Sequence, residues 1–566
     1  RKLCSSNYGI TLIALVVTII VLLILAGITI TTVLGDNGVI ELAKQAKKET
    51  VVATVKEAID IAKLSKSLEK EDGLITEDEL KEILENYGEI IYDESGEIIE
   101  GIIENQEGYE VLLPDIMDGV INQNIYVKLY ANGTLAFSNN KNTVIEGTQI
   151  GKDYGNIKGQ GFSMTAELKP GGDSSSAYDW TFITNAPWGK DRTSITNVTF
   201  LDEVKPSSTS SWFAGCTSLT EFKNLQNLNT KYVTNMSYMF ASCTTLESLD
   251  LTSLNTQKVD NFESIFASCW NLKNLNVSNV NTSSAIDVSR MFYMCEKLTI
   301  IDVSKFDTRN VTNMESMFSG CINVKELDVS NFDTSKVTNM GAMFNNCKSL
   351  TTLDVSNFNT SQNTNMYYMF SYLTVTEIKG IENFNTQNVT NMYHTFYLCR
   401  NLTNLDVSGF NTSKVTTMGQ MFSICENLTS LNVSNFDTSK VTDMNAMFYC
   451  CYKLTNLDLT NFNTSQVIDM NQMFAGCQRL TNLDVSNFNT SRVTNMSLMF
   501  SSCFELTNLD LSSFDTNSVT NMRAMFKDSN KLTAIYVGTK WKIKEETNID
   551  EMFSNCGTSN VTPKTI

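Results

Sequence analysis

LTNLDVSGFNTSKVTTMGQMFSICEN, residues 402–427, is a 26-residue stretch whose plan the next 26 residues repeat. A phenylalanine recurs at fourteen positions at a spacing of 26 or 27 residues, from Phe213 to Phe553, and in most copies a cysteine follows three residues later. A fixed period of this size is the signature of a solenoid. One such repeat cannot bury its own apolar side chains, so stability must come from the stacked array.

The first half of the quoted repeat predicts a strand, because Leu405 and Val407 alternate with polar residues at the period of a half-buried strand. The second half predicts a short helix, because its apolar residues follow the i, i+3, i+4, i+7 spacing of one helix face. These residues are Met418, Met421, Phe422 and Cys425. We therefore expect an α/β repeat fold, a leucine-rich-repeat-like solenoid of about thirteen 26-residue turns, each a strand plus a short helix.

Several copies share the pattern LDVSNFDTSKVTNMxxMFxxC, for example residues 327–347 and, with small changes, residues 431–451. This pattern resembles the repeats of the BspA-like leucine-rich repeat family of bacterial surface proteins. The resemblance covers roughly residues 196–556. It implies a solenoid fold and a role in adhesion or interaction at the cell surface.

The composition argues against nucleic-acid binding and against catalysis. The chain has 566 residues, a net charge of −19 and an isoelectric point of about 4.7, and so acidic a chain is a poor ligand for nucleic acid. Its one histidine is His394, which leaves little material for a Ser-His-Asp triad or a histidine metal site. We expect no enzyme activity, no cofactor and no metal site, and we expect His394 on the surface of a repeat helix.

The N-terminal segment predicts a membrane anchor. Residues 10–34 are 25 residues without a charge, long enough to span a bilayer as a helix. Gly9 followed by Ile10, ahead of this apolar run, resembles the type IV prepilin signal, which implies cleavage after Gly9 and a methylated Ile10. Pilins carry Glu at the fifth mature position, where this chain has Ala14. Incorporation into a pilus shaft is therefore disfavoured, and an uncleaved membrane anchor is the alternative.

These features divide the chain into five expected regions. Residues 1–9 are a leader peptide, 10–70 a transmembrane and pilin-like long helix, 71–150 a small α+β module, 151–195 a linker and the start of a cap, and 196–566 the solenoid with its caps. Within the module, Asn132-Gly133 predicts a hairpin turn between strands near residues 125–129 and 134–137.

The recurring cysteines allow two interpretations. The slot that they occupy holds Leu373 in one repeat and Ser529 in another, so it is chiefly a buried position for a small side chain. This favours a spine of reduced cysteines. Cysteines stacked about 5 Å apart in neighbouring turns could instead bridge as a disulfide ladder.

Two sets of side chains outside the expected core are candidate binding residues. The first is an acidic ladder at one strand position, which is either a solvated face or a ligand contact. Its members are Asp302, Asp328, Asp354, Asp406, Asp458, Asp484 and Asp510. The second set surrounds an irregular repeat that reads VTEIKGI at residues 375–381, and clustered exposed tyrosines are favoured at interfaces. Its members are Tyr367, Tyr368, Tyr372, Tyr393, His394 and Tyr397.

Together these features favour a non-enzymatic bacterial surface protein, anchored in the membrane or in a pilus. Its extracellular solenoid would bind a protein or a glycan on another surface. The alternative is a minor pilin or pseudopilin of a type IV pilus or secretion machinery, whose partners would be pilus subunits.

Overall fold

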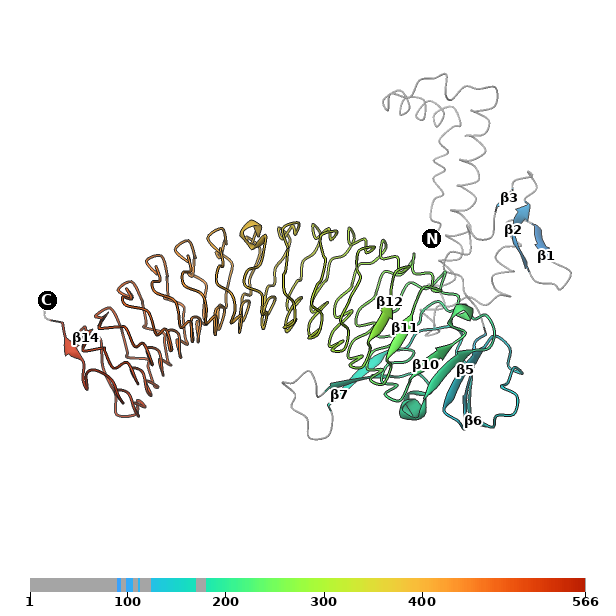
Figure 1. The fold of residues 1–566 in the computed structure, drawn as a ribbon, viewed down its shortest axis with the longest axis horizontal. Helices are drawn as coiled ribbons and strands as arrows, with labels where there is room; N and C mark the ends of the chain where they lie inside the picture. Colours follow the sequence, from blue (N-terminus) through green and yellow to red (C-terminus); the bar gives the residue numbers. More distant parts are fainter. Residues whose placement is uncertain (1–88, 93–97, 105–109, 112–123, 169–179, 565–566) are drawn as a thin grey trace, which may run out of the picture. The chain divides into compact units, whose positions relative to one another are not determined.

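The structure, a computed structural model, describes residues 89–92, 98–104, 110–111, 124–168 and 180–564 (Figure 1). Contacts divide the chain into two compact units, residues 1–122 and 123–566. The leader with Gly9 and Ile10, and the long helix expected over residues 10–70, lie outside the described residues. Within the described ranges, no helix is both long and apolar enough to cross a bilayer.

In the first unit, three antiparallel strands form one sheet in the order β1-β2-β3. They are β1 (Glu89–Tyr92), β2 (Ile98–Glu104) and β3 (Glu110–Val111). Strand β2 lies in the middle and pairs with both of its neighbours.

The second unit begins with a five-stranded sheet in the order β10-β9-β5-β4-β6. Its strands are β4 (Tyr126–Tyr130), β5 (Thr134–Ser138), β6 (Ile150–Asn156), β9 (Asn197–Phe200) and β10 (Glu221–Lys223). Strands β4 and β5 form the predicted hairpin, and its turn holds Gly133 at a φ of +82°, which glycine adopts at little cost. Because β5, β9 and β10 run parallel, the sheet leads directly into the parallel stacking of the solenoid.

Strands also occur between residues 151 and 195, where we expected a linker. Besides β6, strand β7 (Met164–Leu168) pairs antiparallel with β8 (Trp180–Thr184), and the 3-10 helix η3 (Gly189–Ser194) follows. Trp188 and Trp212 are fully buried and both contact Phe137, whose ring lies parallel to that of Trp212 at a centroid distance of 5.2 Å. This stretch therefore contributes to a packed cap over the first coil.

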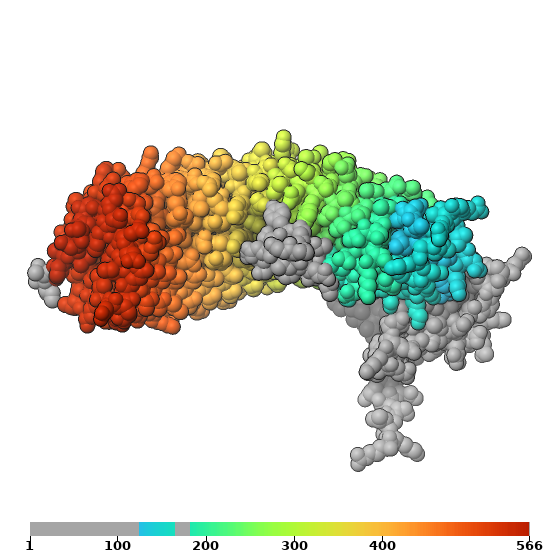
Figure 2. Space-filling model, turned by 90° about the horizontal axis from the view of Figure 1, so that it is seen from below, coloured from blue at the N-terminus to red at the C-terminus, as the bar shows by residue number. Residues whose placement is uncertain are grey.

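The rest of the chain winds into coils that stack in one row (Figure 1). In the space-filling view, the coils follow one another in chain order as a continuous surface (Figure 2). The strands and 3-10 helices of this row are η4 (Leu225–Asn227), β11 (Ser248–Asp250), β12 (Asn274–Asn276), η5 (Ile381–Asn383), β13 (Asn508–Leu511), β14 (Ala534–Val537) and β15 (Thr562–Pro563). Strand β11 pairs parallel with β12, and β14 pairs parallel with both β13 and β15.

Most coils are joined through a segment other than the predicted strand. Isolated parallel bridges connect one Asn, Asp or Thr of each coil to its equivalent in the next, without a break from Asn235 to Asn548. In the quoted repeat, Leu405 and Val407 are buried and Asp406 is exposed, so the predicted alternation is confirmed. These three residues form no strand there, because the ladder of bridges passes through Thr417 instead.

The predicted short helices are wrong. Residues 419–424 form consecutive turns, because alternate N–H groups are used to join the coils. The N–H groups of Met418, Gln420 and Phe422 donate to carbonyls of the next coil at 2.8–3.1 Å, whereas that of Met421 donates to the Met418 carbonyl. Gln420 has a φ of +54°, which a right-handed helix excludes. These turns bury the same apolar side chains that a helix would bury, so the periodicity alone could not distinguish the two conformations.

The core of the solenoid is a stack of phenylalanine rings. The fourteen recurring phenylalanines contact one another in sequence order, from Phe213 to Phe553, with neighbouring centroids 5.5–6.0 Å apart. In the quoted repeat, Met418, Met421 and Phe422 are fully buried, as the sequence pattern predicts.

A spine of free cysteines runs beside the rings. From Cys243 to Cys503, each recurring thiol donates to the phenylalanine carbonyl of the preceding coil, as Cys425 does to Phe396 at 3.2 Å. The cysteines of the described residues are free, as the interpretation as a reduced spine predicts. Burial raises the pKa of the Cys451 thiol to about 12, so almost none of it is thiolate at neutral pH.

A second spine, of buried threonines, was not predicted. Thr464 donates its hydroxyl to the Asn489 carbonyl of the next coil at 3.0 Å and accepts the Asn489 N–H at 2.8 Å. Equivalent threonines from Thr230 to Thr516 donate to the next coil in the same way. One hydroxyl thus satisfies two backbone groups at a corner where the coils share no strand.

Candidate functional site

One coil departs from the common plan. Leu373 and Val375 are two residues apart, whereas Cys347 and Leu350 occupy the same slots three residues apart. The bridge from Asp354 to Lys379 accordingly spans 25 residues. The missing residue is restored at η5, which follows Gly380 at a φ of +84°. The coil therefore has the usual length but a different path.

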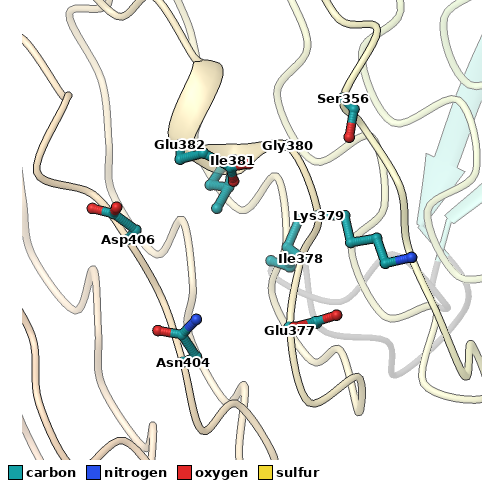
Figure 3. A pocket seen from close by; sticks show the side chains of 9 residues that line it. All are labelled: Ser356, Glu377, Ile378, Lys379, Gly380, Ile381, Glu382, Asn404 and Asp406. Carbon is teal, nitrogen blue, oxygen red and sulfur yellow. The ribbon is translucent and has the colours of Figure 1, made fainter.

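This altered path leaves a hollow of about 390 Å³ on the surface of the solenoid (Figure 3). Its apolar floor is formed by Ile378 and Ile381, which are 3% exposed. Charged and amide side chains form its rim: Glu377, Lys379, Glu382, Asn404 and Asp406. Figure 3 shows Asn404 and Asp406 on the coil next to the irregular one, which carries Glu377 and Ile378. The hollow suits a small polar group that makes several hydrogen bonds.

Polar residues also enter core slots of the irregular coil and of the coil before it. Asn363 is fully buried at a position where other coils have valine; its Oδ1 accepts the Met340 N–H at 3.2 Å, but its Nδ2 has no partner. Thr395 stands where other coils have methionine and donates to the Met392 carbonyl at 2.8 Å. Buried polar groups cost stability, and native proteins tolerate such departures mainly at functional sites.

The structure brings the six predicted aromatic residues into one cluster, hereafter the aromatic cluster: Tyr367, Tyr368, Tyr372, Tyr393, His394 and Tyr397. The His394 ring lies at its centre, stacked on Tyr393 at a centroid distance of 4.0 Å and on Tyr397 at 4.4 Å. Tyr368 meets His394 edge-on at 4.3 Å, and Tyr372 meets Tyr397 at 5.4 Å. Tyr372 is 40% exposed, and the other four tyrosines are half-buried. The cluster thus offers ring faces and edges to solvent.

The expected surface position of His394 is wrong. His394 belongs to a turn and not a helix, it is 6% exposed, and neither ring nitrogen has a hydrogen-bond partner among the described residues. The neighbouring rings bury it because two consecutive coils carry aromatic residues at equivalent positions. Burial lowers the pKa of His394 to about 4, so the imidazole is neutral at pH 7.

On one side, the aromatic cluster ends in a neutralised charge network. The Tyr367 ring lies over Gly341, where a Cβ would approach it to 2.2 Å, and its hydroxyl donates to Glu315 Oε1 at 2.7 Å. Arg290 pairs with the same carboxylate at 2.7 Å and with Glu263 at 3.5 Å. Glu315 is therefore satisfied within the solenoid.

On the other side, the cluster ends at Gly419. A Cβ on this residue would lie 2.7 Å from Asp443 Oδ2, 2.9 Å from the Asn445 amide nitrogen and 3.1 Å from the Tyr393 ring. A carboxylate oxygen, an amide and an aromatic edge therefore converge over one glycine. Asp443 Oδ1 accepts the Asn445 backbone N–H at 2.9 Å and side-chain N–H at 2.7 Å, which fixes the carboxylate in place.

The acidic ladder has a local structural role that the sequence did not reveal. Its aspartates are exposed, apart from Asp510, which is half-buried and pairs with Lys564. Each accepts the backbone N–H two residues later at 2.9–3.0 Å: Asp302, Asp328, Asp354, Asp406, Asp458, Asp484 and Asp510. Hydrogen bonds from Ser408 lower the pKa of Asp406. No group of three or more potential metal-ligating side chains converges within the part of the chain that the structure describes.

The residues that flank the aromatic cluster were missed by the sequence analysis. Two glycines could have indicated them. Gly341 occupies the slot of Tyr367 in the preceding coil, and Gly419 occupies the slot of Tyr393 in the following coil. A glycine in this slot leaves room for the neighbouring ring. Asp443 then follows two coils after Asn391, too far along the chain to suggest a contact.

Comparison with solved structures shows remote likenesses to bacterial leucine-rich repeat proteins. One is a leucine-rich repeat protein from Bacteroides ovatus, 13% identical over 75% of this chain and 89% of that one, with a TM-score of 0.30. A leucine-rich cell surface protein from Faecalibacterium prausnitzii is 16% identical over 78% and 93%, with a TM-score of 0.28. A leucine-rich repeat protein from Eubacterium ventriosum is 14% identical over 75% and 98%, with a TM-score of 0.32. Likenesses this remote identify no partner.

No curated protein matches the sequence. A family model described as "Mycoplasma protein of unknown function, DUF285" matches residues 207–300, 294–375, 372–480 and 451–565. These matches cover the coils without a gap and more than half of the chain. The chain therefore belongs to the DUF285 family.

Proposed function

We propose that this chain is a non-enzymatic bacterial surface protein whose solenoid binds a protein or glycan on another surface. The observation that carries the proposal is the coincidence, within three neighbouring coils, of the aromatic cluster, the hollow at η5 and polar residues in core slots. Solenoids of similar turns present similar surfaces everywhere, so specific recognition needs a place where the pattern breaks. Tyrosines supply apolar area and a hydroxyl at small entropic cost.

The resemblance of the repeats to BspA-like proteins supports the surface location. The apolar run at residues 10–34 supports membrane anchoring, with the solenoid outside the cell. The absence of a second histidine supports a binding role over a catalytic one.

The proposal is tested by substituting serine for Tyr367, Tyr368, Tyr393 and Tyr397 in the full chain and measuring retention on an immobilised panel of proteins and glycans. We expect the ligands that wild-type chain retains to bind the variant at least about tenfold more weakly. The matched control is Tyr238→Ser, in the slot of Tyr368 five coils earlier. Retention of no ligand by the wild-type chain, or unchanged binding by the quadruple variant, would contradict the proposal.

A second candidate function is a minor pilin or pseudopilin. The order Gly9–Ile10 ahead of an apolar run favours it, whereas Ala14 departs from the pilin pattern. A blot for N-terminal processing at Gly9 in cells with and without prepilin peptidase distinguishes this function from a simple membrane anchor. Processing that depends on the peptidase supports it, and an uncleaved chain in both strains excludes it.

A further inference from the structure

The two sides of the aromatic cluster carry the same groups but not the same charge balance. On the Tyr367 side, the carboxylate of Glu315 is paired with Arg290 at 2.7 Å. On the Tyr393 side, the carboxylate of Asp443 accepts hydrogen bonds from Asn445 and pairs with no lysine or arginine of the described residues. Asp443 Oδ2, the oxygen that faces Tyr393 over Gly419, accepts no hydrogen bond within those residues. Among the residues that the structure describes, a cation thus pairs with the carboxylate at one end of the cluster and none pairs with that at the other.

A second carboxylate increases the negative charge at this end. Asp443 and Asp469 are consecutive members of the ladder of bridges, in adjacent coils. Burial and the charge of Asp443 raise the pKa of Asp469. Like charges at neighbouring ladder positions disfavour one another, and most coils avoid the conflict by placing an asparagine in this slot. An external cation would relieve the repulsion.

The rings beside these carboxylates also suit a cation. A guanidinium or ammonium group binds the face of a tyrosine ring within about 6 Å of its centre, and a nearby carboxylate strengthens the contact. Tyr393 and Tyr397 both stack on a buried imidazole that is neutral, so no positive charge within the cluster opposes such a group. The net charge of −19 adds long-range attraction for a basic partner.

We infer that the aromatic cluster recognises a basic protein segment, and that an arginine or lysine of this partner binds at the outer side of the Tyr393 ring, beside the carboxylates of Asp443 and Asp469. This inference rests on the proposed function and specifies the partner of the same site. A glycan without positive charge is the occupant that it excludes.

The test uses the full chain and two labelled dodecapeptides, (Gly-Arg)6 and (Gly-citrulline)6. Citrulline keeps the length and the planar end of the arginine side chain, but its urea group is neutral and has fewer N–H donors. We expect saturable binding of the arginine peptide, at least about tenfold tighter than that of the citrulline peptide. The double variant Asp443→Asn, Asp469→Asn should bind the arginine peptide about tenfold more weakly. Both substitutions should fold, because asparagine occupies the same slot in coils such as that of Asn495.

The matched control is Asp328→Asn, Asp354→Asn, which removes the same charge from the acidic ladder, where Asn276 and Asn432 already occur. Its binding should stay within about twofold of wild type. Equal loss of binding in both double variants would show that the attraction is diffuse and not specific to this site. Equal binding of the two peptides would show that the site does not recognise charge. Either result overturns the inference.

The two proposals fail separately. If the quadruple tyrosine variant loses its ligands on the panel while the Asp443, Asp469 variant keeps them all, the cluster binds a partner but not through a cation. If the tyrosine variant keeps every ligand, the site itself is wrong.

Discussion

The coil of residues 402–427 and the coil that contains η5 have the same length, but the chain follows a different path in each. In the first, valine, methionine and cysteine fill the inner slots, and the surface carries small polar side chains. In the second, Thr395 takes a methionine slot and aromatic rings cover the outside, and Leu373 takes the cysteine slot of the coil just before it. The Phe396 ring nevertheless stacks on both of its neighbours, at 5.6 Å and 5.7 Å.

In this solenoid, therefore, one set of residues maintains the fold and another set is free to serve recognition. The phenylalanine stack and the ladder of bridges pass through the irregular coil without interruption. The other slots can therefore vary while the neighbouring coils hold the chain in place. Substitutions in the two regions can test this separation.

Replacing a stacked phenylalanine should cost the same in both coils. Phe422→Ala in the regular coil and Phe396→Ala in the irregular coil should each lower the free energy of unfolding by about 3–5 kcal/mol, because each leaves a cavity in one continuous stack. Urea denaturation of the two variants measures the effect. A much smaller loss for Phe396→Ala would mean that the stack is already weakened at the irregular coil.

Exchanging valine and asparagine between the regular coil and the coil that precedes η5 should have opposite effects. Val415→Asn places an amide in a fully buried apolar slot and should cost roughly 2–3 kcal/mol. Asn363→Val removes the unpartnered Nδ2 and restores the residue of the other coils, so it should change stability by no more than about 1 kcal/mol and in the favourable direction. Comparable losses from both would show that Asn363 is required by its coil.

The single histidine gives the irregular coil a pH dependence that the regular coils lack. Because burial lowers the pKa of folded His394 to about 4 from an ordinary value of 6.5, the unfolded chain binds the proton more readily. The stability that the neutral imidazole contributes is complete above pH 6.5 and is lost as the pH falls toward 4. At pH 5 the loss is about 1–2 kcal/mol.

His394→Gln, which introduces the residue of the equivalent Gln420, should abolish this part of the pH dependence. Proton NMR of the one imidazole in the wild-type chain reads the pKa directly. A value near 6.5 in the folded chain would place the ring in solvent.

Asp406→Ala should have the smallest effect. Its exposed carboxylate accepts the backbone N–H and the hydroxyl of Ser408, so its loss should cost about 0.5–1 kcal/mol. Denaturation beside Phe422→Ala provides the comparison. Losses of similar size from both would show that the acidic ladder contributes as much to the fold as the phenylalanine stack.

The solenoid, its period and its buried residues could be predicted from the sequence, because Phe422 and its equivalents recur at a fixed spacing. It did not predict the conformation between Met418 and Cys425. Successive turns and a short helix bury the same side chains, and the choice depends on hydrogen bonds to the next coil. It also missed the threonine spine, since a threonine in an N-T-S turn looks like ordinary turn chemistry.

For the candidate site, the sequence found the aromatic residues through their 26-residue offsets and placed His394 outside when it lies among them. The hollow at η5 and the contact of Tyr393 with Gly419 depend on the path of the chain, which composition does not specify. The partner itself leaves no mark in the repeat pattern.

The central claim is that recognition is concentrated where the repeat pattern breaks. It is tested most directly by a regularised chain, in which residues 374–399 are replaced by a copy of residues 400–425 and Leu373 by cysteine. We expect a denaturation midpoint equal to or above that of the wild-type chain, together with loss of the ligands that the wild-type chain retains on the panel. A regularised chain that is equally stable and still retains those ligands would contradict it.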